Sequence, residues 1–194
     1  MRDLNRNLDP RRAAWLMTDA RVGDVIAAIR ALPPGAGIVF RQRELARGAR
    51  HALFLRVRRL AKARRMRLSA AGGLPGAAAH GGRRAATHPA HDRRQAIAAV
   101  RAGATLLFVS PLFATRSHPG AAALGPGRAV PIARGLPVAR IALGGMDGQR
   151  WLRLRRYGFD GWAAIDALAV APAHAGRAAP SGARAGSIRS QRLP

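Results

Sequence analysis

The chain of 194 residues contains no cysteine. Without thiols it can form no disulfide bridge, no thiolate zinc site and no cysteine nucleophile. The lack of cysteine also agrees with a reducing compartment, since disulfides persist mainly in oxidising ones. Any catalytic or metal-binding chemistry must therefore come from other side chains.

Long apolar runs are missing too. No stretch of about 18 uninterrupted apolar residues occurs, which is the length that a membrane-spanning helix needs. The first residues, MRDLNRNLDPRRAAWLM, carry Asp3 and Asp9 and lack the apolar core of a signal peptide. We therefore expect a cytoplasmic protein with no membrane partner.

Acidic residues are scarce. Asp and Glu number 9 against 34 Lys and Arg, which gives a formal net charge of +25. Such a surplus attracts polyanions without specificity, and it suits a pocket for phosphorylated small molecules. The arginines are spread along the whole chain, and no aromatic-basic stacking pattern accompanies them. We therefore expect no specific nucleic-acid partner.

Short apolar runs alternate with amphipathic stretches along the chain. A hydrophobic content of 48% suits one domain with a real core. Alternating strands and helices favour a parallel sheet. The predicted strands are Trp15–Thr18, Gly37–Phe40, Arg67–Ala70, Ala77–His80, Arg84–Thr87, Ala104–Ser110, Pro137–Leu143 and Gly161–Ile165. The predicted helices are Val22–Leu32, Ala52–Arg65, His91–Ala102, Gly127–Arg134 and Asp147–Tyr157.

This element order predicts an α/β fold, a (β/α)8 TIM barrel. The chain is short for that fold, whose lower limit is about 200 residues. We therefore expect a shortened barrel over residues 12–170, preceded by a flexible N-terminus over residues 1–11. Residues 171–194 are rich in Arg, Ala, Pro and Gly and poor in large apolar groups, which predicts a disordered C-terminal tail.

Polar residues and glycines gather after the predicted sixth and seventh strands. The stretch SPLFATRSHPGAAALG follows the sixth strand and places Thr115, Ser117 and His118 in one loop. Gly144 and Gly145 follow the seventh strand, just before a helix. The backbone N–H groups of such a turn can approach an anion with no Cβ in the way, and barrels often bind phosphate there. We expect Thr115, Ser117, Gly144 and Gly145 to bind phosphate.

These stretches resemble the thiamine phosphate synthase/TenI family. FVSPLFATRSHPGAAALG is similar to the family's sixth-strand motif, G-P-V-F-x-T-x-[ST]-K-P-G-x-x-x-x-G. PVARIALGGM, GFDGWAAIDAL, WLMTD and ATHPAHDRRQAIAAVRAGATLLFVSP are similar to its seventh-, eighth-, first- and fifth-strand segments. The resemblance covers about Trp15 to Leu168 and implies the (β/α)8 barrel that the element order also predicts.

The resemblance implies a transferase of thiamine biosynthesis. Synthases of the family couple a pyrimidine pyrophosphate to a thiazole phosphate and release pyrophosphate. The resemblance assigns phosphate binding to the sixth-strand loop, in which His118 takes the place of the family's lysine. The second-strand motif Q-x-R-E-K appears as Arg41-Gln42-Arg43-Glu44-Leu45, which makes Arg41, Arg43 and Glu44 predicted substrate-binding residues.

Several departures from the family pattern concern charge. The third-strand motif N-D-R, whose Asp holds Mg²⁺, appears as Ser69-Ala70-Ala71, and the segment expected to supply the next Asp, Ala77–Arg84, has no acid. Asp166 replaces an eighth-strand serine whose neighbouring amides cradle phosphate. We therefore predict no metal site and no resident cofactor, although Mg²⁺ is expected for the family.

Three alternatives stay open. The chain could be a synthase, a metal-free tautomerase-like enzyme, or a degenerate barrel that binds a phosphorylated ligand without chemistry. The TenI-like tautomerase moves a proton with a histidine on the fifth-strand loop, a position that His88 occupies by the resemblance. The predicted catalytic residues are therefore His88 and His118. Whether the chain is an enzyme, and its oligomeric state, do not follow from the sequence.

Overall fold

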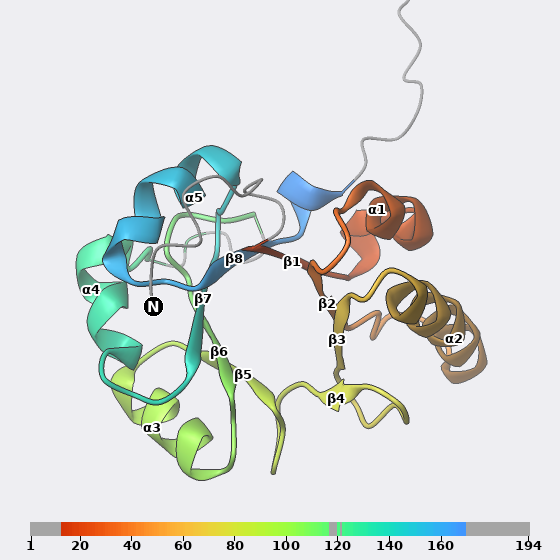
Figure 1. Cartoon of the computed structure of the whole chain (residues 1–194), viewed down its shortest axis with the longest axis horizontal. Helices are drawn as coiled ribbons and strands as arrows, with labels where there is room; N and C mark the ends of the chain where they lie inside the picture. The colour runs from red at the N-terminus through yellow and green to blue at the C-terminus, as the bar shows by residue number, and fades with distance from the viewer. Residues whose placement is uncertain (1–12, 117–119, 121, 170–194) are drawn as a thin grey trace, which may run out of the picture.

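A computed structural model describes residues 13–116, 120 and 122–169 of the chain. The predicted flexible N-terminus, the predicted tail over 171–194, Ser117 and His118 lie outside these residues. The described part is a ring of short strands with helices on its outside (Figure 1). The strands are β1 (Ala14–Met17), β2 (Gly37–Phe40), β3 (Arg67–Ala70), β4 (Ala78–Ala79), β5 (Thr87–Ala90), β6 (Leu106–Val109), β7 (Ala139–Leu143) and β8 (Gly161–Ala164).

All strand pairs are parallel, and the sheet runs in the order β4-β3-β2-β1-β8-β7-β6-β5. Its two edge strands meet through one parallel bridge between His80 and Thr87. The His80 Nδ1 atom lies 2.9 Å from the Thr87 hydroxyl, which adds a side-chain contact at this point. The predicted eight-stranded barrel is confirmed, with its weakest closure between β4 and β5.

Helices follow five of the eight strands: α1 (Val25–Ala31), α2 (Arg47–Ala63), α3 (Arg93–Arg101), α4 (Gly125–Ala133) and α5 (Gly148–Leu154). The described residues after β3 and β4 form only turns, and β8 is followed by a short 3-10 turn, Asp166–Leu168. Three aspartates cap helices, since Asp24, Asp92 and Asp147 each accept a backbone N–H from the first turn. No helix in the described part is long and apolar enough to cross a membrane.

The fifth strand lies three residues later than the predicted Arg84–Thr87. Gly81, Gly82 and Arg84 have positive φ angles, so the chain turns where the strand was expected. Thr87–Ala90 then pairs residue by residue with Leu106–Val109 of β6. This correction matters for the site, because it places His88 within β5 and His91 just beyond the end of β5.

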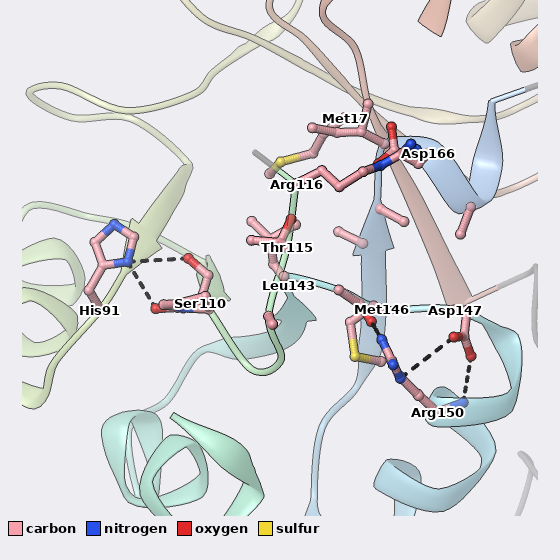
Figure 2. Close-up of a pocket in the computed structure, with 18 of the residues that line it drawn as sticks. Met17, His91, Ser110, Thr115, Arg116, Leu143, Met146, Asp147, Arg150 and Asp166 are labelled. Atoms are coloured by element: carbon pink, nitrogen blue, oxygen red, sulfur yellow. Dashed lines mark hydrogen bonds and ion pairs between the residues drawn. The ribbon is translucent and has the colours of Figure 1, made fainter. Parts of the chain in front are cut away.

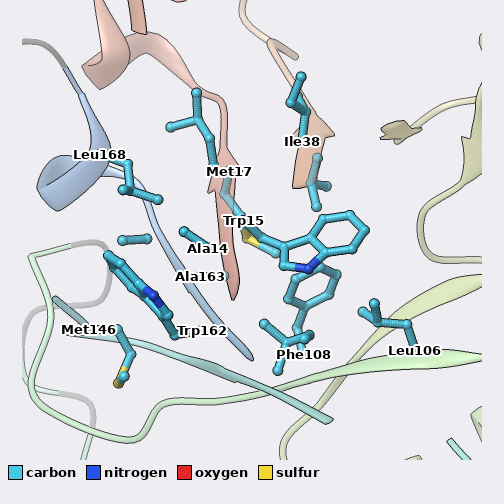
Figure 3. Close-up of a cluster of buried hydrophobic side chains, with 14 of the residues drawn as sticks. Ala14, Trp15, Met17, Ile38, Leu106, Phe108, Met146, Trp162, Ala163 and Leu168 are labelled. Atoms are coloured by element: carbon cyan, nitrogen blue, oxygen red, sulfur yellow. The ribbon is translucent and has the colours of Figure 1, made fainter. Parts of the chain in front are cut away.

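Buried aromatic and aliphatic side chains, among them Trp15 and Phe108, pack together in the interior (Figure 3). The ring of Trp15 meets the ring of Phe108 edge-on at 5.5 Å, and Arg67 lies 4.6 Å from the Trp15 ring. Trp15 pairs with Gly37, where a Cβ atom would overlap the indole ring. Gly37 and Arg67 are the first residues of β2 and β3, so this packing lies toward the end of the barrel where the strands begin.

Candidate functional site

A cavity of about 580 Å³ opens at the carboxyl ends of the strands (Figure 2). In TIM barrels this end carries the active site, because the loops after the strands converge there. Much of its lining is apolar, from Met17, Pro111, Ala114, Leu143, Met146, Ala163, Ala164, Ile165 and Ala167. The polar and glycine lining consists of Arg41, His91, Ser110, Thr115, Arg116, Gly144, Gly145, Asp147, Arg150 and Asp166. An apolar wall with a few converging polar groups is typical of a small-molecule site.

Gly144 and Gly145 form a tight turn between β7 and α5. Their φ angles are +94° and +59°, and a Cβ on either residue would collide with the loop after β6. The carbonyl oxygens of Leu143 and Gly144 accept hydrogen bonds from Leu112 and Phe113 of that loop. Because N–H and C=O point in opposite directions across a trans peptide, the N–H groups of Gly144 and Gly145 are directed away from the β6 loop, toward the β8 side.

Arg150 supports this glycine turn from α5. Its guanidinium donates to the carbonyl oxygen of Gly145, lies 4.8 Å from the Phe113 ring, and forms an ion pair with Asp147 at 3.7 Å. Asp147 also caps α5 by accepting the Arg150 N–H at 2.8 Å. These contacts hold the turn in one conformation, which is what a backbone anion site requires.

A chain of alternating charges connects three residues that line the cavity, Arg41, Asp166 and Arg116. We call it the charged arc; its members are Arg41, Asp19, Arg21, Asp166 and Arg116. Asp19 Oδ2 lies 2.6 Å from an Arg21 nitrogen and 3.6 Å from Arg41 Nη2. Asp166 Oδ2 lies 3.1 Å from Arg116 Nη2 and 3.9 Å from Arg21 Nη1. The arc thus links the ends of β1, β2 and β8 with the loop after β6.

Burial and neighbouring charges shift two pKa values in the charged arc. Burial lowers the pKa of Arg41 below its ordinary value; Asp19 opposes this effect, and the nearby cations Arg43 and Arg21 add to it. Burial alone would raise the pKa of Asp19, but the hydrogen bonds and charge of Arg21 and the charge of Arg41 outweigh it and leave that pKa lowered. The carboxyl group of Asp19 is therefore stabilised in its ionised form, whereas the guanidinium of Arg41 is partly shielded from water.

His91 joins the cavity from the end of β5. Its Nδ1 atom lies 2.9 Å from the Ser110 carbonyl oxygen and 3.2 Å from the Ser110 hydroxyl. A carbonyl oxygen can only accept, so Nδ1 carries the proton of the neutral ring and Nε2 keeps its lone pair. His91 therefore has one nitrogen fixed on the protein and the other available to exchange a proton.

The structure brings together only part of the predicted site. Thr115, Gly144, Gly145 and Arg41 line the cavity, whereas Arg43 and Glu44 are exposed and are not among its lining residues. His88 does not line the cavity either, and its Nε2 atom lies 2.8 Å from the Gly82 carbonyl oxygen. Ser117 and His118 lie outside the described residues.

Sequence reasoning missed His91, Arg116, Asp147 and Arg150 as site residues. A usable signal for His91 was the capping pair that follows it. Asp92 accepts the Gln95 N–H at 2.7 Å, and the Gln95 side chain accepts the His91 N–H at 3.0 Å. This reciprocal capping marks residues 91–95 as a helix start, and hence His91 as the residue at the strand end.

The residues present do not fit the Mg²⁺ ion that the family resemblance implies. The third strand ends in Ser69, Ala70 and Ala71, where the Ser69 hydroxyl is buried without a hydrogen-bond partner and no carboxylate is near in sequence. Arg50 donates its guanidinium to the carbonyl oxygen of Ala71, so a cation already lies beside this strand end. Among the described residues no group of three or more His, Asp and Glu side chains is placed to hold a metal. Mg²⁺ usually takes one or two carboxylates, and these positions supply none.

Two kinds of comparison with known proteins gave matches: a family sequence pattern matches the C-terminal part of the barrel, and solved structures match its fold. The sequence pattern of the family described as thiamine monophosphate synthase matches residues 76–168. The match covers slightly less than half of the 194 residues, so the chain is similar to this family over its C-terminal part. The match includes β5 to β8, which contribute His91, the β6 loop and the glycine turn. No curated protein matches the chain.

Solved structures share the fold at low sequence identity. Thiamine phosphate pyrophosphorylase from Pyrococcus furiosus superposes with a TM-score of 0.69 at 18% identity, covering 84% of this chain and 91% of that one. A structure described as native KDPGal gives a TM-score of 0.58 at 15% identity over 83% and 85%. Thiamine phosphate pyrophosphorylase from Bacteroides thetaiotaomicron gives 0.51 at 14% identity over 79% and 82%. At these identities the likeness shows the fold alone.

Proposed function

We propose that this chain is a thiamine phosphate synthase-like transferase of thiamine biosynthesis, whose cavity holds phosphorylated heterocycles. The observation that carries the proposal is the composition of one cavity. It combines an apolar wall, a glycine turn whose N–H groups point away from the β6 loop, and arginine side chains in its lining. Flat heterocycles suit the apolar wall, and their phosphates suit the N–H groups and guanidiniums. The absence of cysteine supports a cytoplasmic location.

In the proposed reaction the thiazole ring nitrogen forms a bond to the methylene carbon of the pyrimidine substrate. The bond from that carbon to the diphosphate oxygen breaks, and the diphosphate leaves with the electron pair. The glycine turn would hold the thiazole phosphate, and the arginines would hold the diphosphate. Fixing both partners in one cavity turns a bimolecular step into a nearly unimolecular one.

The direct test supplies the purified protein with both thiamine precursors and measures pyrophosphate release and thiamine phosphate formation. The companion test asks whether the gene restores growth of a strain that lacks its thiamine phosphate synthase. Product formation that is lost in Gly145→Asp, which adds a Cβ and a negative charge beside the glycine turn, would support the proposal. Arg59→Gln, an exposed arginine on α2 far from the cavity lining, is the matched control.

A second candidate function, a tautomerase-like proton transfer, rests on the position of His91. A histidine with one nitrogen fixed by a backbone carbonyl and the other free is suited to general acid–base chemistry, and such chemistry needs no metal. The cavity would then shift a proton on a thiazole phosphate carboxylate, as a tautomerase does. Proton exchange at the thiazole without pyrophosphate release would favour this candidate, and ligand binding with neither activity would favour a non-catalytic barrel.

A further inference from the structure

The coupling reaction releases a diphosphate, and its developing charge needs compensation. A divalent cation commonly supplies this charge, but the ends of β3 and β4 lack the carboxylates that would hold one. The cavity is instead lined by Arg41 just after β2, Arg116 in the β6 loop and Arg150 in α5. The compensating charge can therefore come from the protein itself.

Arg41 is held by contacts to two neighbouring elements. Its backbone N–H donates to the Thr18 hydroxyl at 3.0 Å, and its carbonyl oxygen accepts from Arg50 Nε at 3.2 Å. Its guanidinium lies 3.6 Å from Asp19 and 3.8 Å from the sulfur of Met17. Contacts to β1 and α2 thus fix both the backbone and the head of this side chain. A charge held in this way needs little reorganisation when an anion arrives.

The charged arc leaves Arg41 incompletely neutralised. Asp19 makes its short contact of 2.6 Å with Arg21 and only a longer one of 3.6 Å with Arg41. The nearest carboxylate oxygen to the Arg41 guanidinium in the arc is therefore shared with a closer cation. The lowered pKa of Arg41 agrees with a desolvated cation that an anionic ligand would stabilise.

Arg116 offers a second cation of a different kind. It rises from the β6 loop and reaches Asp166 at the end of β8, and both residues line the cavity (Figure 2). Its side chain is 82% exposed, so it can move with little loss of packing. Arg41, held in place beside the cavity, and the exposed Arg116 could contact the two ends of an extended anion such as a diphosphate.

We propose that this cavity binds a diphosphate group directly on Arg41 and Arg116, without a divalent cation. The role of that diphosphate as a leaving group rests on the proposed function, but its binding does not. Guanidinium groups suit this task because their forked N–H donors match pairs of phosphate oxygens. The ion that the family resemblance implies is thus replaced by side-chain charge in this chain.

The first experiment measures the binding of inorganic pyrophosphate by calorimetry, once with EDTA and once with Mg²⁺. About 0.15 M salt screens the many surface arginines, and the expected result is one site per chain. We expect equal or tighter binding in EDTA, because Mg²⁺ competes for the same phosphate oxygens. Binding that requires Mg²⁺ would overturn the proposal without any variant being made.

The second experiment compares variants whose folding is checked by thermal melting. Arg41→Gln should weaken pyrophosphate binding in EDTA by about 10- to 100-fold, since a charge-assisted hydrogen bond is lost. Arg41→Lys should recover part of the affinity, because it restores charge without the fork. Arg59→Gln should bind as the wild type does. Equal affinity of Arg41→Gln and wild type would overturn the assignment of Arg41.

The outcome separates this inference from the proposed function. If pyrophosphate binds without metal and depends on Arg41, but the two thiamine precursors are not coupled, the inference stands and the proposed synthase activity is wrong. Mg²⁺-dependent coupling that is unaffected by Arg41→Gln would sustain the synthase and refute the inference.

Discussion

The Nδ1 atom of His91 lies 2.9 Å from the carbonyl oxygen of Ser110, which joins the ends of β5 and β6 at the wall of the cavity. The acceptor is a backbone atom, so no side-chain substitution at position 110 removes it. The contact fixes the tautomer of His91 and leaves Nε2 as the proton acceptor. Proton transfer in this cavity is therefore expected to depend on His91.

Replacing His91 by alanine should lower any proton-transfer turnover by about 100-fold or more, the usual contribution of a general acid–base residue. Ser110→Ala keeps the backbone carbonyl and loses only the hydroxyl at 3.2 Å, so it should have a much smaller effect. The measurement is turnover at saturating thiazole phosphate carboxylate. His88→Ala decides between the two histidines: a larger loss in His88→Ala than in His91→Ala would restore the sequence-based prediction.

His80 links stability to pH. Burial, together with the charges of Arg41, His88 and Arg43, lowers the pKa of His80 from 6.5 to about 4. Between these two values the unfolded chain binds a proton that the folded chain does not. The free energy of unfolding should therefore be highest above pH 6.5 and fall toward pH 4, by roughly 2–3 kcal/mol at most. Urea unfolding at a series of pH values measures this slope.

His80→Asn tests the origin of that slope. Asparagine does not titrate, and it can keep a polar contact to Thr87 at the bridge between β4 and β5. We expect the variant to be less stable at pH 7 but to lose less stability than the wild type between pH 6.5 and 4. An unchanged slope would mean that the acid sensitivity arises elsewhere.

Two nearby glycines allow a matched test of the anion turn. Gly145→Ala places a Cβ against Ala114 and Phe113 at a φ of +59°, so we expect a loss of about 2–4 kcal/mol from strain and overlap. Gly148→Ala meets nothing within 4 Å and lies at the start of α5, so it should be neutral or stabilising by up to about 1 kcal/mol.

Thermal melting compares the stabilities of the two variants, and calorimetry with inorganic phosphate compares their affinities. Only Gly145→Ala should lose phosphate binding, because only Gly145 belongs to the turn whose N–H groups face the β8 side. Unimpaired phosphate binding by a folded Gly145→Ala protein would place the anion elsewhere.

Local patterns were enough to predict most of the barrel. Gly37–Phe40 and Arg67–Ala70 are strands with the predicted bounds, because each is a short run bordered by strong turn or helix signals. The fifth strand was predicted three residues early, because its segment is poor in large apolar side chains. Its true position is set by pairing with β6, which no local pattern records. The choice of His88 followed the family resemblance, and the structure places His88 within β5 and His91 just beyond its end.

The charged arc could not be predicted from the sequence either. Asp166 was read as an anion in the place of a phosphate-cradling serine, which counts against phosphate binding. The structure places it against Arg116 at 3.1 Å, a partner 50 residues away, and near Arg21 at the opposite end of the chain. Barrel closure makes these contacts, so the charge of Asp166 is already compensated before a ligand arrives.

This pairing makes Asp166 a competitor of the ligand for Arg116. Asp166→Asn removes the competing charge and leaves Arg116 available to contact an anion. An exposed ion pair contributes only about 0.2–1 kcal/mol, so we expect pyrophosphate to bind about two- to fivefold more tightly, with little change in stability. Calorimetry in EDTA measures the affinity, and thermal melting measures the stability.

Asp24→Asn is the control for net charge, because it also removes one carboxylate but lies at the start of α1, where asparagine caps equally well. Affinity should rise in Asp166→Asn and stay unchanged in Asp24→Asn. Equal gains in both variants would show a general effect of net charge. Weaker binding in Asp166→Asn would mean that the carboxylate takes part in holding the anion, as a ligand of a metal ion would, and the cation role assigned to Arg116 would then be wrong.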